Sequence, residues 1–142
     1  MKILIINGPN INLLEHRPEA EYGALSLKEI EEMIKKEFQD HQIEFFQSNH
    51  EGELIDKIQS ASKSVDGLIL NPGGYSHTSV AIRDALELCP IPKIEVHLSN
   101  LASRENFRHN MLTASKCDGY ISGFRVNSYL AALFLLEKLI SR

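Results

Sequence analysis

Short apolar runs alternate with amphipathic segments along the whole chain, and this alternation restricts the fold more than any other feature. Apolar runs of about 4–8 residues bounded by turn residues are typical of buried strands, whereas apolar residues spaced three and four apart are typical of helices. One helix start is explicit, because Ser26 and Glu29 form a capping box. We therefore predict strands at residues 3–6, 43–46, 67–70, 93–98 and 119–122, and helices that begin at residue 26, pass through 54–61, cover 80–88 and close the chain through 139.

The predicted order of these elements favours a parallel sheet with helices on both faces. We expect an α/β fold of the flavodoxin-like type, a three-layer sandwich with a five-stranded parallel sheet. A chain of 142 residues with 43% apolar and 24% charged residues is long enough to bury a core and fits one domain over residues 1–142. Such a fold specifies no function by itself.

The charge and the apolar segments argue against several classes of partner. A net charge of −4 and a pI near 5.8 argue against nucleic acid or an anionic membrane, because both need clustered positive charge. The apolar stretches at 3–6 and 129–136 are too short for a signal peptide and for a membrane span, which takes about 20 residues. The two cysteines, Cys89 and Cys117, form no CxxC motif, so we expect reduced thiols and a cytoplasmic protein.

A polar, glycine-containing motif occupies the junction between the predicted strand 67–70 and the predicted helix 80–88. Its sequence is Asn71-Pro72-Gly73-Gly74-Tyr75-Ser76-His77-Thr78-Ser79. Ligands of open α/β sheets bind at the carboxyl ends of strands, where such a junction lies. The two glycines let the backbone approach a ligand closely, and Asn71, Ser76, His77 and Thr78 supply hydrogen-bonding groups. The motif therefore predicts a small-molecule site.

The connection after the first predicted strand, residues 8–25, is longer than the usual βα connection of 2–6 residues. It carries Asn10, Asn12, Arg17 and Tyr22. We predict a lid that closes over bound substrate. The alternative is a solvated excursion in which an Arg and a Tyr occur by chance.

Two further pairs follow the strand at 93–98. Glu95 and His97 are two residues apart, so on a strand they point to the same face. A carboxylate beside an imidazole favours its protonated form and fixes its tautomer, although an ordinary polar pair at a strand end is the alternative. Arg104 and Arg108 are four apart, which predicts one helical face on a pocket rim suited to an anionic, oxygen-rich substrate. Surface solvation is the alternative for the arginines.

Together these motifs resemble the type II 3-dehydroquinate dehydratases. The resemblance runs in order from residue 3 to about residue 133. It is carried by Asn7-Gly8-Pro9-Asn10-Ile11-Asn12-Leu13-Leu14, Arg17, Tyr22-Gly23, residues 71–79, Glu95-Val96-His97-Leu98-Ser99-Asn100, Arg104 and Phe107-Arg108.

The resemblance implies a single catalytic domain, residues 1–142, that removes water from 3-dehydroquinate by anti elimination through an enolate. The product would be 3-dehydroshikimate, in the shikimate pathway of aromatic amino acid biosynthesis or in quinate breakdown. It implies no cofactor, no metal ion and no Schiff base. It also implies a homo-oligomer built from trimers, commonly four of them in a dodecamer.

The resemblance also assigns roles to individual residues. The base would be Tyr22 as tyrosinate, favoured by the charges of Arg17 and Arg104. The acid would be His97, oriented by Glu95, while Asn10 would hold a water that stabilises the enolate. The implied substrate-binding residues are Asn71 and the backbone amides of Leu98 and Ser99 for the carboxylate, His77 and Arg108 for ring hydroxyls, and Asp84 for the site of a neighbouring subunit.

Three places depart from the usual pattern of this family. Glu15 stands where a Gly is common, and Pro18-Glu19 replaces a frequent order in which the Pro comes second. Both lie in the predicted lid, so they bear on its movement and on the turnover rate. Arg125-Val126-Asn127-Ser128 occupies a region often richer in Gly. We expect that departure to affect the edge of the last strand and subunit packing rather than the chemistry.

Other functional classes lack their characteristic residues in this chain. A phosphoacceptor domain would have Asp where Asn71 stands, and Gly8-Pro9-Asn10 is not the GxGxxG loop of a dinucleotide site. The GxSxG motif of serine hydrolases is absent, as is metal-site spacing of Cys, His and carboxylates. The remaining alternative is a non-catalytic or altered-specificity relative that binds a cyclic polyol carboxylate.

Overall fold

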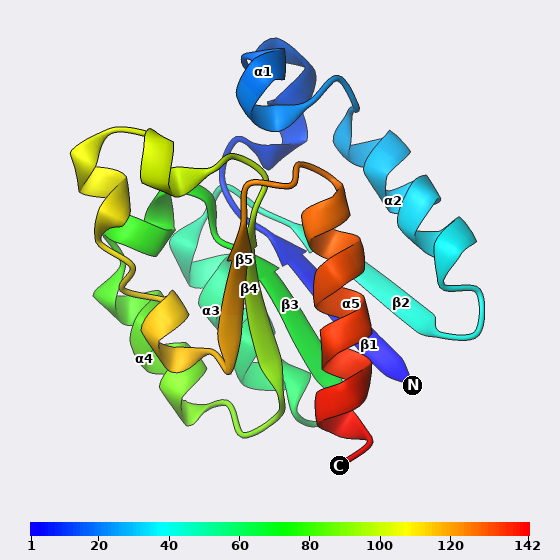
Figure 1. The fold of residues 1–142 in the computed structure, drawn as a ribbon. Coiled ribbons are helices and arrows are strands. Elements are labelled where there is room, and N and C mark those ends of the chain that lie inside the picture. The colour runs from blue at the N-terminus through cyan, green and yellow to red at the C-terminus, as the bar shows by residue number, and fades with distance from the viewer.

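Five parallel strands form one sheet in the computed structural model of the chain, which describes residues 1–142 (Figure 1). The strand order is β2-β1-β3-β4-β5, and every neighbouring pair is parallel. The predicted flavodoxin-like α/β fold with a five-stranded parallel sheet is confirmed, with strand ends that differ from the predicted ones by at most one residue. The strands are β1 (Lys2–Asn7), β2 (Gln42–Gln47), β3 (Gly67–Asn71), β4 (Lys93–His97) and β5 (Gly119–Ser122).

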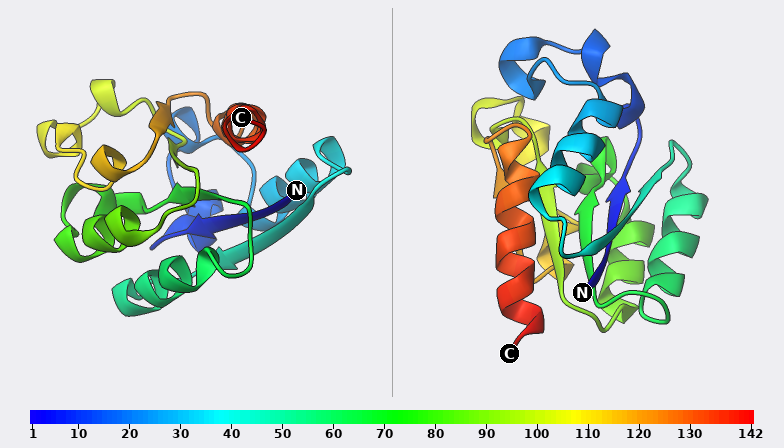
Figure 2. Two further views of the ribbon diagram at one scale, coloured as in Figure 1. Left: turned by 90° about the horizontal axis from the view of Figure 1, so that it is seen from below. Right: turned by 90° about the vertical axis from the view of Figure 1, so that its right-hand side faces the viewer.

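Helices cover both faces of the sheet and complete the three layers (Figure 2). On one face lie α2 (Leu27–Glu37) and α5 (Asn127–Ile140), and on the other lie α3 (Glu51–Ala61) and α4 (Val80–Leu88). The capping box forms at the start of α2, where the Ser26 hydroxyl accepts from the Glu29 amide and the Glu29 carboxylate accepts from the Ser26 amide, both at 3.2 Å. None of the helices combines the length and apolarity needed to cross a lipid bilayer.

The central strands β1 and β3 are apolar over most of their length because both of their faces are buried, whereas β4 also buries Glu95 and His97. Along β1, Ile3 and Ile5 pack in the core layer beneath α2 and α5, whereas Leu4 and Ile6 pack in the layer beneath α3 and α4. A strand with one exposed face would alternate apolar and polar residues instead. Because both faces are buried, the strands appear in the sequence as short continuous apolar runs.

The segment predicted to be a lid, residues 8–25, contains two short helices and is called the lid below. It folds into the 3-10 helix η1 (Ile11–His16) and the single-turn helix α1 (Glu19–Tyr22), above the carboxyl ends of the strands (Figure 1). Ile11, Leu14 and Tyr22 are buried in the core layer on the α2 and α5 side. Three more short 3-10 helices that periodicity did not predict lie between β4 and β5: η3 (Leu101–Ser103), η4 (Asn106–His109) and η5 (Ala114–Lys116).

The carboxyl ends of β1, β3 and β4 meet at one edge of the sheet because these strands are neighbours. Asn7 at the end of β1 pairs with Asn71 at the end of β3, and Leu70 pairs with Glu95 of β4. The Gly8 amide donates to the Asn71 carbonyl at 2.7 Å, which holds the lid entrance against the polar motif after β3. All three clusters predicted from the sequence therefore start at the same edge.

Replacing Gly8 by Ala should destabilise this edge. An added Cβ would lie 2.6 Å from the Pro72 carbonyl oxygen, a backbone atom that cannot rotate away. We expect the free energy of unfolding, measured by urea denaturation, to fall by about 1–3 kcal/mol. Gly119→Ala is the matched control, because nothing lies within 4 Å of a Cβ added at the start of β5. Equal urea midpoints for the two variants would contradict the prediction.

Candidate active site

The phenolic oxygen of Tyr22 is held by two guanidinium groups. Arg17 donates to it through Nη2 at 2.5 Å, and Arg104 donates through Nη1 at 2.7 Å. The guanidinium of Arg17 also lies 3.9 Å from the centre of the Tyr22 ring. Tyr22 is the last residue of α1 and only 7% exposed, so its oxygen faces these cations in a largely buried setting. Negative charge on that oxygen would be stabilised by both guanidinium groups.

Arg104 is fixed in place by several partners besides Tyr22. Its Nη1 donates to the Ser99 hydroxyl at 2.9 Å, and its Nη2 lies 3.5 Å from the Glu21 carboxylate. Partial burial opposes the charge of Arg104, but the hydrogen bond to Tyr22 and the negative charges nearby raise its pKa above the usual value. Arg104 is therefore a permanent cation that joins the lid to the turn after β4.

Arg104 and Arg108 do not lie on one helical face, so the prediction from their spacing is wrong. The side chain of Asn100 caps the separate 3-10 helix η3, which ends before Arg104. Arg104 itself is extended, with φ −98° and ψ −172°, and Arg108 belongs to the next helix, η4. The two side chains diverge as a result, because Arg104 reaches Tyr22 whereas Arg108 pairs with Glu105.

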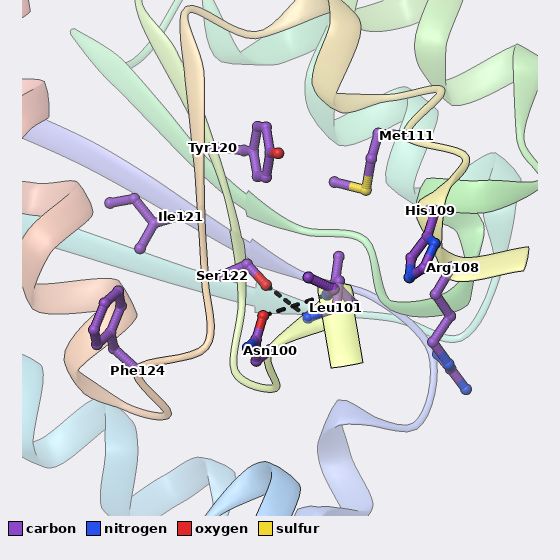
Figure 3. Close-up of a pocket in the computed structure, with 10 residues that line it drawn as sticks. Asn100, Leu101, Arg108, His109, Met111, Tyr120, Ile121, Ser122 and Phe124 are labelled. Atoms are coloured by element: carbon purple, nitrogen blue, oxygen red, sulfur yellow. Dashed lines mark hydrogen bonds between the residues drawn. The ribbon is translucent and has the colours of Figure 1, made fainter. Parts of the chain in front are cut away.

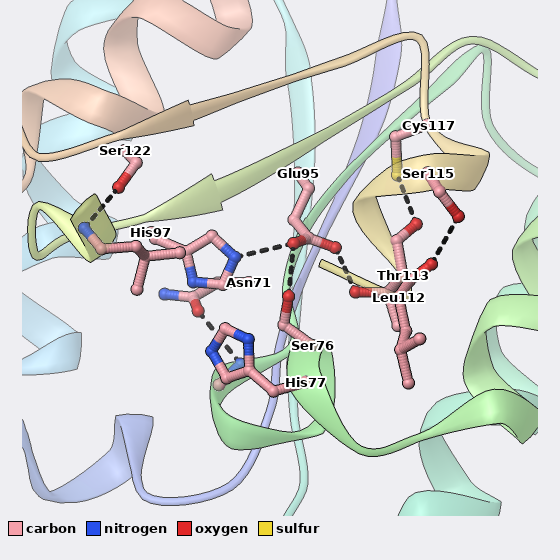
Figure 4. Close-up of polar contacts among 12 residues, drawn as sticks. Asn71, Ser76, His77, Glu95, His97, Leu112, Thr113, Ser115, Cys117 and Ser122 are labelled. Atoms are coloured by element: carbon pink, nitrogen blue, oxygen red, sulfur yellow. Dashed lines mark hydrogen bonds and ion pairs between the residues drawn. The ribbon is translucent and has the colours of Figure 1, made fainter. Parts of the chain in front are cut away.

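Glu95 and His97 form a buried pair on β4 (Figure 4). Nε2 of His97 lies 2.7 Å from the Glu95 carboxylate, which is fully buried. The hydroxyl of Ser76 donates to the same carboxylate at 2.8 Å, and so does the hydroxyl of Thr113. Because the Glu95 carboxylate is the acceptor in these contacts, Nε2 of His97 carries a hydrogen, and Nδ1 is the nitrogen left to interact with a ligand.

Two hydroxyl groups complete the surroundings of Glu95: that of Ser76, predicted only as a hydrogen-bonding residue of the polar motif, and that of Thr113, which was not predicted. Ser76 belongs to the polar motif after β3, but its spacing from Glu95 in the sequence gives no sign that the two meet. Thr113 precedes η5 in the irregular segment before β5, and no motif marks it. Its amide donates to the Ser76 carbonyl at 3.4 Å, so backbone contacts as well as side chains bring these elements together.

His77 is a buried neutral imidazole beside His97. Its Nδ1 donates to the Asn110 carbonyl at 2.9 Å, which leaves Nε2 as an acceptor, and that buried Nε2 has no partner in the chain. The rings of His77 and His97 stack with their centres 6.0 Å apart. Burial, together with the charges of His97 and Arg108, lowers the pKa of His77 below its usual value. A buried acceptor without a partner suits a ligand hydroxyl.

Asn71 is held at the end of β3 by a buried polar chain. Its amide donates to the Tyr129 hydroxyl at 3.0 Å, and its side-chain carbonyl accepts from the Gly73 amide at 3.2 Å. The Tyr129 hydroxyl donates in turn to Asn7 at 2.5 Å. Burial raises the pKa of Tyr129, so this hydroxyl stays protonated and remains a donor. One amide hydrogen of Asn71 is left for a ligand.

The turn after β4 supplies two further donors. Leu98 and Ser99 are buried, and their backbone amides have no hydrogen-bond acceptor within the chain. Unpaired amides at the carboxyl edge of a parallel sheet suit an anionic ligand group. Both amides directly follow His97 in the sequence, and the hydroxyl of Ser99 accepts a hydrogen bond from Arg104.

Two other predicted residues stand apart from these contacts. Asn10 adopts a left-handed backbone with φ 69°, its amide donates to the Asn49 side chain at 3.1 Å, and its own side chain makes no hydrogen bond. Asp84 lies on α4, where it is exposed and pairs with Arg83 at 2.7 Å. No three His, Cys, Asp or Glu side chains are grouped so that they could hold a metal ion.

Comparisons with known proteins agree on one family. The profile of the family described as dehydroquinase class II matches residues 1–137. A 3-dehydroquinate dehydratase from Caldicellulosiruptor bescii is 49% identical over 142 residues, which cover 98% of each chain. One from Carboxydothermus hydrogenoformans is 49% identical over 144 residues, 100% of this chain and 94% of the relative. The crystal structure of type II dehydroquinase from Butyrivibrio crossotus matches with a TM-score of 0.93 and 45% identity, over 96% of this chain and 97% of that one.

Replacing Thr113 by Val should show how much the buried Glu95 carboxylate depends on its donors. Valine keeps the shape of threonine but removes one of the hydroxyl groups that donate to Glu95. We expect the free energy of unfolding in urea to fall by about 1–3 kcal/mol. Thr78→Val is the control, since exposed Thr78 makes only a 3.5 Å contact with the Gly74 carbonyl. A loss no larger than that of the control would contradict this account of Glu95.

Proposed function

The chain belongs to the dehydroquinase class II family, and on that premise we propose how its residues remove water from 3-dehydroquinate. The reaction is an anti elimination through an enolate that gives 3-dehydroshikimate, and residues 1–142 act as one catalytic domain. We place the enzyme in the shikimate pathway and in the cytoplasm. The observation that carries the proposed mechanism is the Tyr22 oxygen between two guanidinium groups, at 2.5 Å from Arg17 and 2.7 Å from Arg104.

In this mechanism Tyr22 acts as a tyrosinate and removes a proton α to the ketone of the substrate. Loss of this proton converts the substrate into an enolate, and the enolate oxygen needs a hydrogen-bond donor directed at it. Asn10 supplies that donor through a bound water. The left-handed backbone at Asn10 and the absence of hydrogen bonds from its side chain support this role.

The second step expels the tertiary hydroxyl group, which leaves as water once it has received a proton. We propose that His97 donates this proton from Nδ1 and regains it between turnovers. Glu95 holds Nε2 and stabilises the imidazolium form. The three donors around the Glu95 carboxylate support its fixed orientation.

The substrate carboxylate binds to Asn71 and to the amides of Leu98 and Ser99, while His77 and Arg108 bind ring hydroxyls. The unpaired amides after β4 and the remaining amide hydrogen of Asn71 support the carboxylate site. Neutral His77 would accept a hydrogen bond from a substrate hydroxyl through Nε2, which otherwise lacks a partner. A protonated His77 could not accept that bond.

We propose that the chain assembles as trimers, four of which form a dodecamer, and that Asp84 of one subunit reaches the site of its neighbour. Val80, Asp84 and Leu88 are each four residues apart on α4 and all exposed, so they form one stripe on the helix surface. A hollow of about 610 Å³ beside β5 contains Arg108 and apolar side chains (Figure 3). The apolar lining residues are Leu101, Ala102, Met111, Tyr120, Ile121 and Phe124. The apolar side chains of this stripe, from α4 of a second subunit, would pack against the apolar lining of the hollow. Asp84 would then lie beside the positive charge of Arg108.

Purified protein mixed with 3-dehydroquinate should form a conjugated enone, followed by its ultraviolet absorbance. Borohydride in a parallel sample should leave the rate unchanged, because no lysine imine forms. Tyr22→Phe should lower kcat about 10²–10⁴-fold, the usual contribution of a general base. The dissociation constant for substrate, from calorimetry, should change little.

Ser60→Ala is the control, because it removes an exposed hydroxyl group of α3 that contacts only the Lys57 carbonyl, and it should keep full turnover. Loss of substrate binding together with turnover in Tyr22→Phe would overturn the role of Tyr22. Binding of substrate by the wild-type protein without turnover would favour the alternative, a relative that only binds a cyclic polyol carboxylate.

The assembly has its own test in variants of α4. Asp84→Ala should keep the oligomer, seen by analytical ultracentrifugation, and lower turnover about tenfold through loss of a substrate contact. Leu88→Asp should break the oligomer, because it replaces an exposed apolar side chain of this stripe with a charged one. Asp56→Ala, which alters an exposed residue of α3, should change neither property. A fully active monomer would contradict the proposed contribution of Asp84.

A further inference from the structure

Arg125 combines an unusual backbone with a contact to the lid. It is one of two non-glycine residues with positive φ, at 51°, a conformation that L-residues other than Asn and Asp rarely adopt. Its backbone is nevertheless fixed, because its amide donates to the Leu98 carbonyl at 2.9 Å and its carbonyl accepts from the Ser128 amide at 3.0 Å. The strain is therefore held by the turn after β4, next to the amides proposed for substrate binding.

The side chain of Arg125 reaches across a cleft to α1. Its Nη2 donates to the Ala20 carbonyl at 3.1 Å, a contact between residues 105 apart in the sequence. The cleft has a volume of about 320 Å³ and is lined by Ala20 and Glu21 on one side and by Ser99, Arg104 and Arg125 on the other. Arg125 thus links the lid to the segment that holds Arg104.

Helix α1 depends on such contacts because it has only four residues. A single turn is not stable by itself, and the last carbonyls of a helix lack partners within it. The Ala20 carbonyl accepts from no backbone amide, so Arg125 supplies its donor. Gly23, which ends α1 with φ 84°, would place a Cβ 3.5 Å from Cδ of Arg125, so the aliphatic part of that side chain lies against the end of the helix.

We propose that Arg125 is a positioning residue that holds α1, and with it Tyr22, against Arg17 and Arg104. The inference rests on the role proposed above for Tyr22 as the base. Arg125 touches neither the Tyr22 oxygen nor the acid pair. It acts through the short helix that carries the base. Arg125 belongs to a segment that departs from the usual family pattern. From the sequence we expected that departure to affect the edge of the last strand, whereas this proposal gives Arg125 a role in the chemistry.

Hydrogen exchange of the free protein tests the contact without any substrate. Arg125→Met keeps a long side chain and the strained backbone but removes the donor to Ala20. The backbone amides of Tyr22 and Gly23 donate to the carbonyls of Pro18 and Glu19 and so report on the folding of α1. They should exchange about threefold to tenfold faster in the variant, as the net strength of one hydrogen bond implies. Amides of α3 serve as the internal reference, and Lys138→Met, which removes an exposed cation of α5, is the matched control.

Kinetics of the same variants tests the positioning role. Arg125→Met should lower kcat about threefold to tenfold and leave KM nearly unchanged, because the substrate-binding residues lie on other elements. Arg125→Gly should show the same kinetic loss while the free energy of global unfolding is kept or raised, since glycine relieves the positive φ.

Unchanged exchange of the α1 amides would overturn the contact, and faster exchange with unchanged kcat would overturn the positioning role. Failure of the base assignment is distinguishable from both, because it would appear as turnover retained in Tyr22→Phe, whereas the exchange experiment uses no substrate.

Discussion

A fully buried carboxylate lies at the centre of this molecule, and the arrangement of three chain segments depends on satisfying it. Removing an ion from water costs several kcal/mol even after the protein relaxes. Glu95 offsets that cost with donors from His97 on its own strand, Ser76 after β3 and Thr113 before β5. A shift of any of these segments would leave charge or a hydroxyl group unpaired. The same contacts that stabilise the fold therefore fix the orientation of His97, the proposed acid.

Tyr22, the proposed base, is positioned in a different way, by a one-turn helix rather than by a strand of the sheet. Helix α1 is one turn long and holds Tyr22 only while the lid is folded onto Arg104. Segments of this kind open at lower free energy than central strands, which suits a part of the site that must admit substrate. The proposed acid and base thus lie on elements of unequal stability, since His97 is on a central strand and Tyr22 is on a one-turn helix held by side-chain contacts.

The sequence predicted what periodicity controls and missed what tertiary contacts decide. Because both faces of the central strands are buried, their apolar runs could be recognised as strands in the sequence. The two-residue period of a strand placed Glu95 and His97 on the same face, as expected. The four-residue spacing of Arg104 and Arg108 failed because the chain there is extended between two short helices. Helices of one turn, such as α1, are too short to show a period. Thr113 contacts Glu95 across 18 residues with no local pattern to mark it.

Two stacked imidazoles show how the surroundings of a side chain assign its chemistry. His77 and His97 lie with ring centres 6.0 Å apart at the same sheet edge. Nε2 of His97 faces the Glu95 carboxylate, whereas burial and neighbouring positive charge lower the pKa of His77 and favour its neutral form. The two rings therefore differ in what they offer a ligand. One nitrogen of His97 is engaged by a carboxylate, while His77 presents Nε2, which has no partner in the chain, as an acceptor.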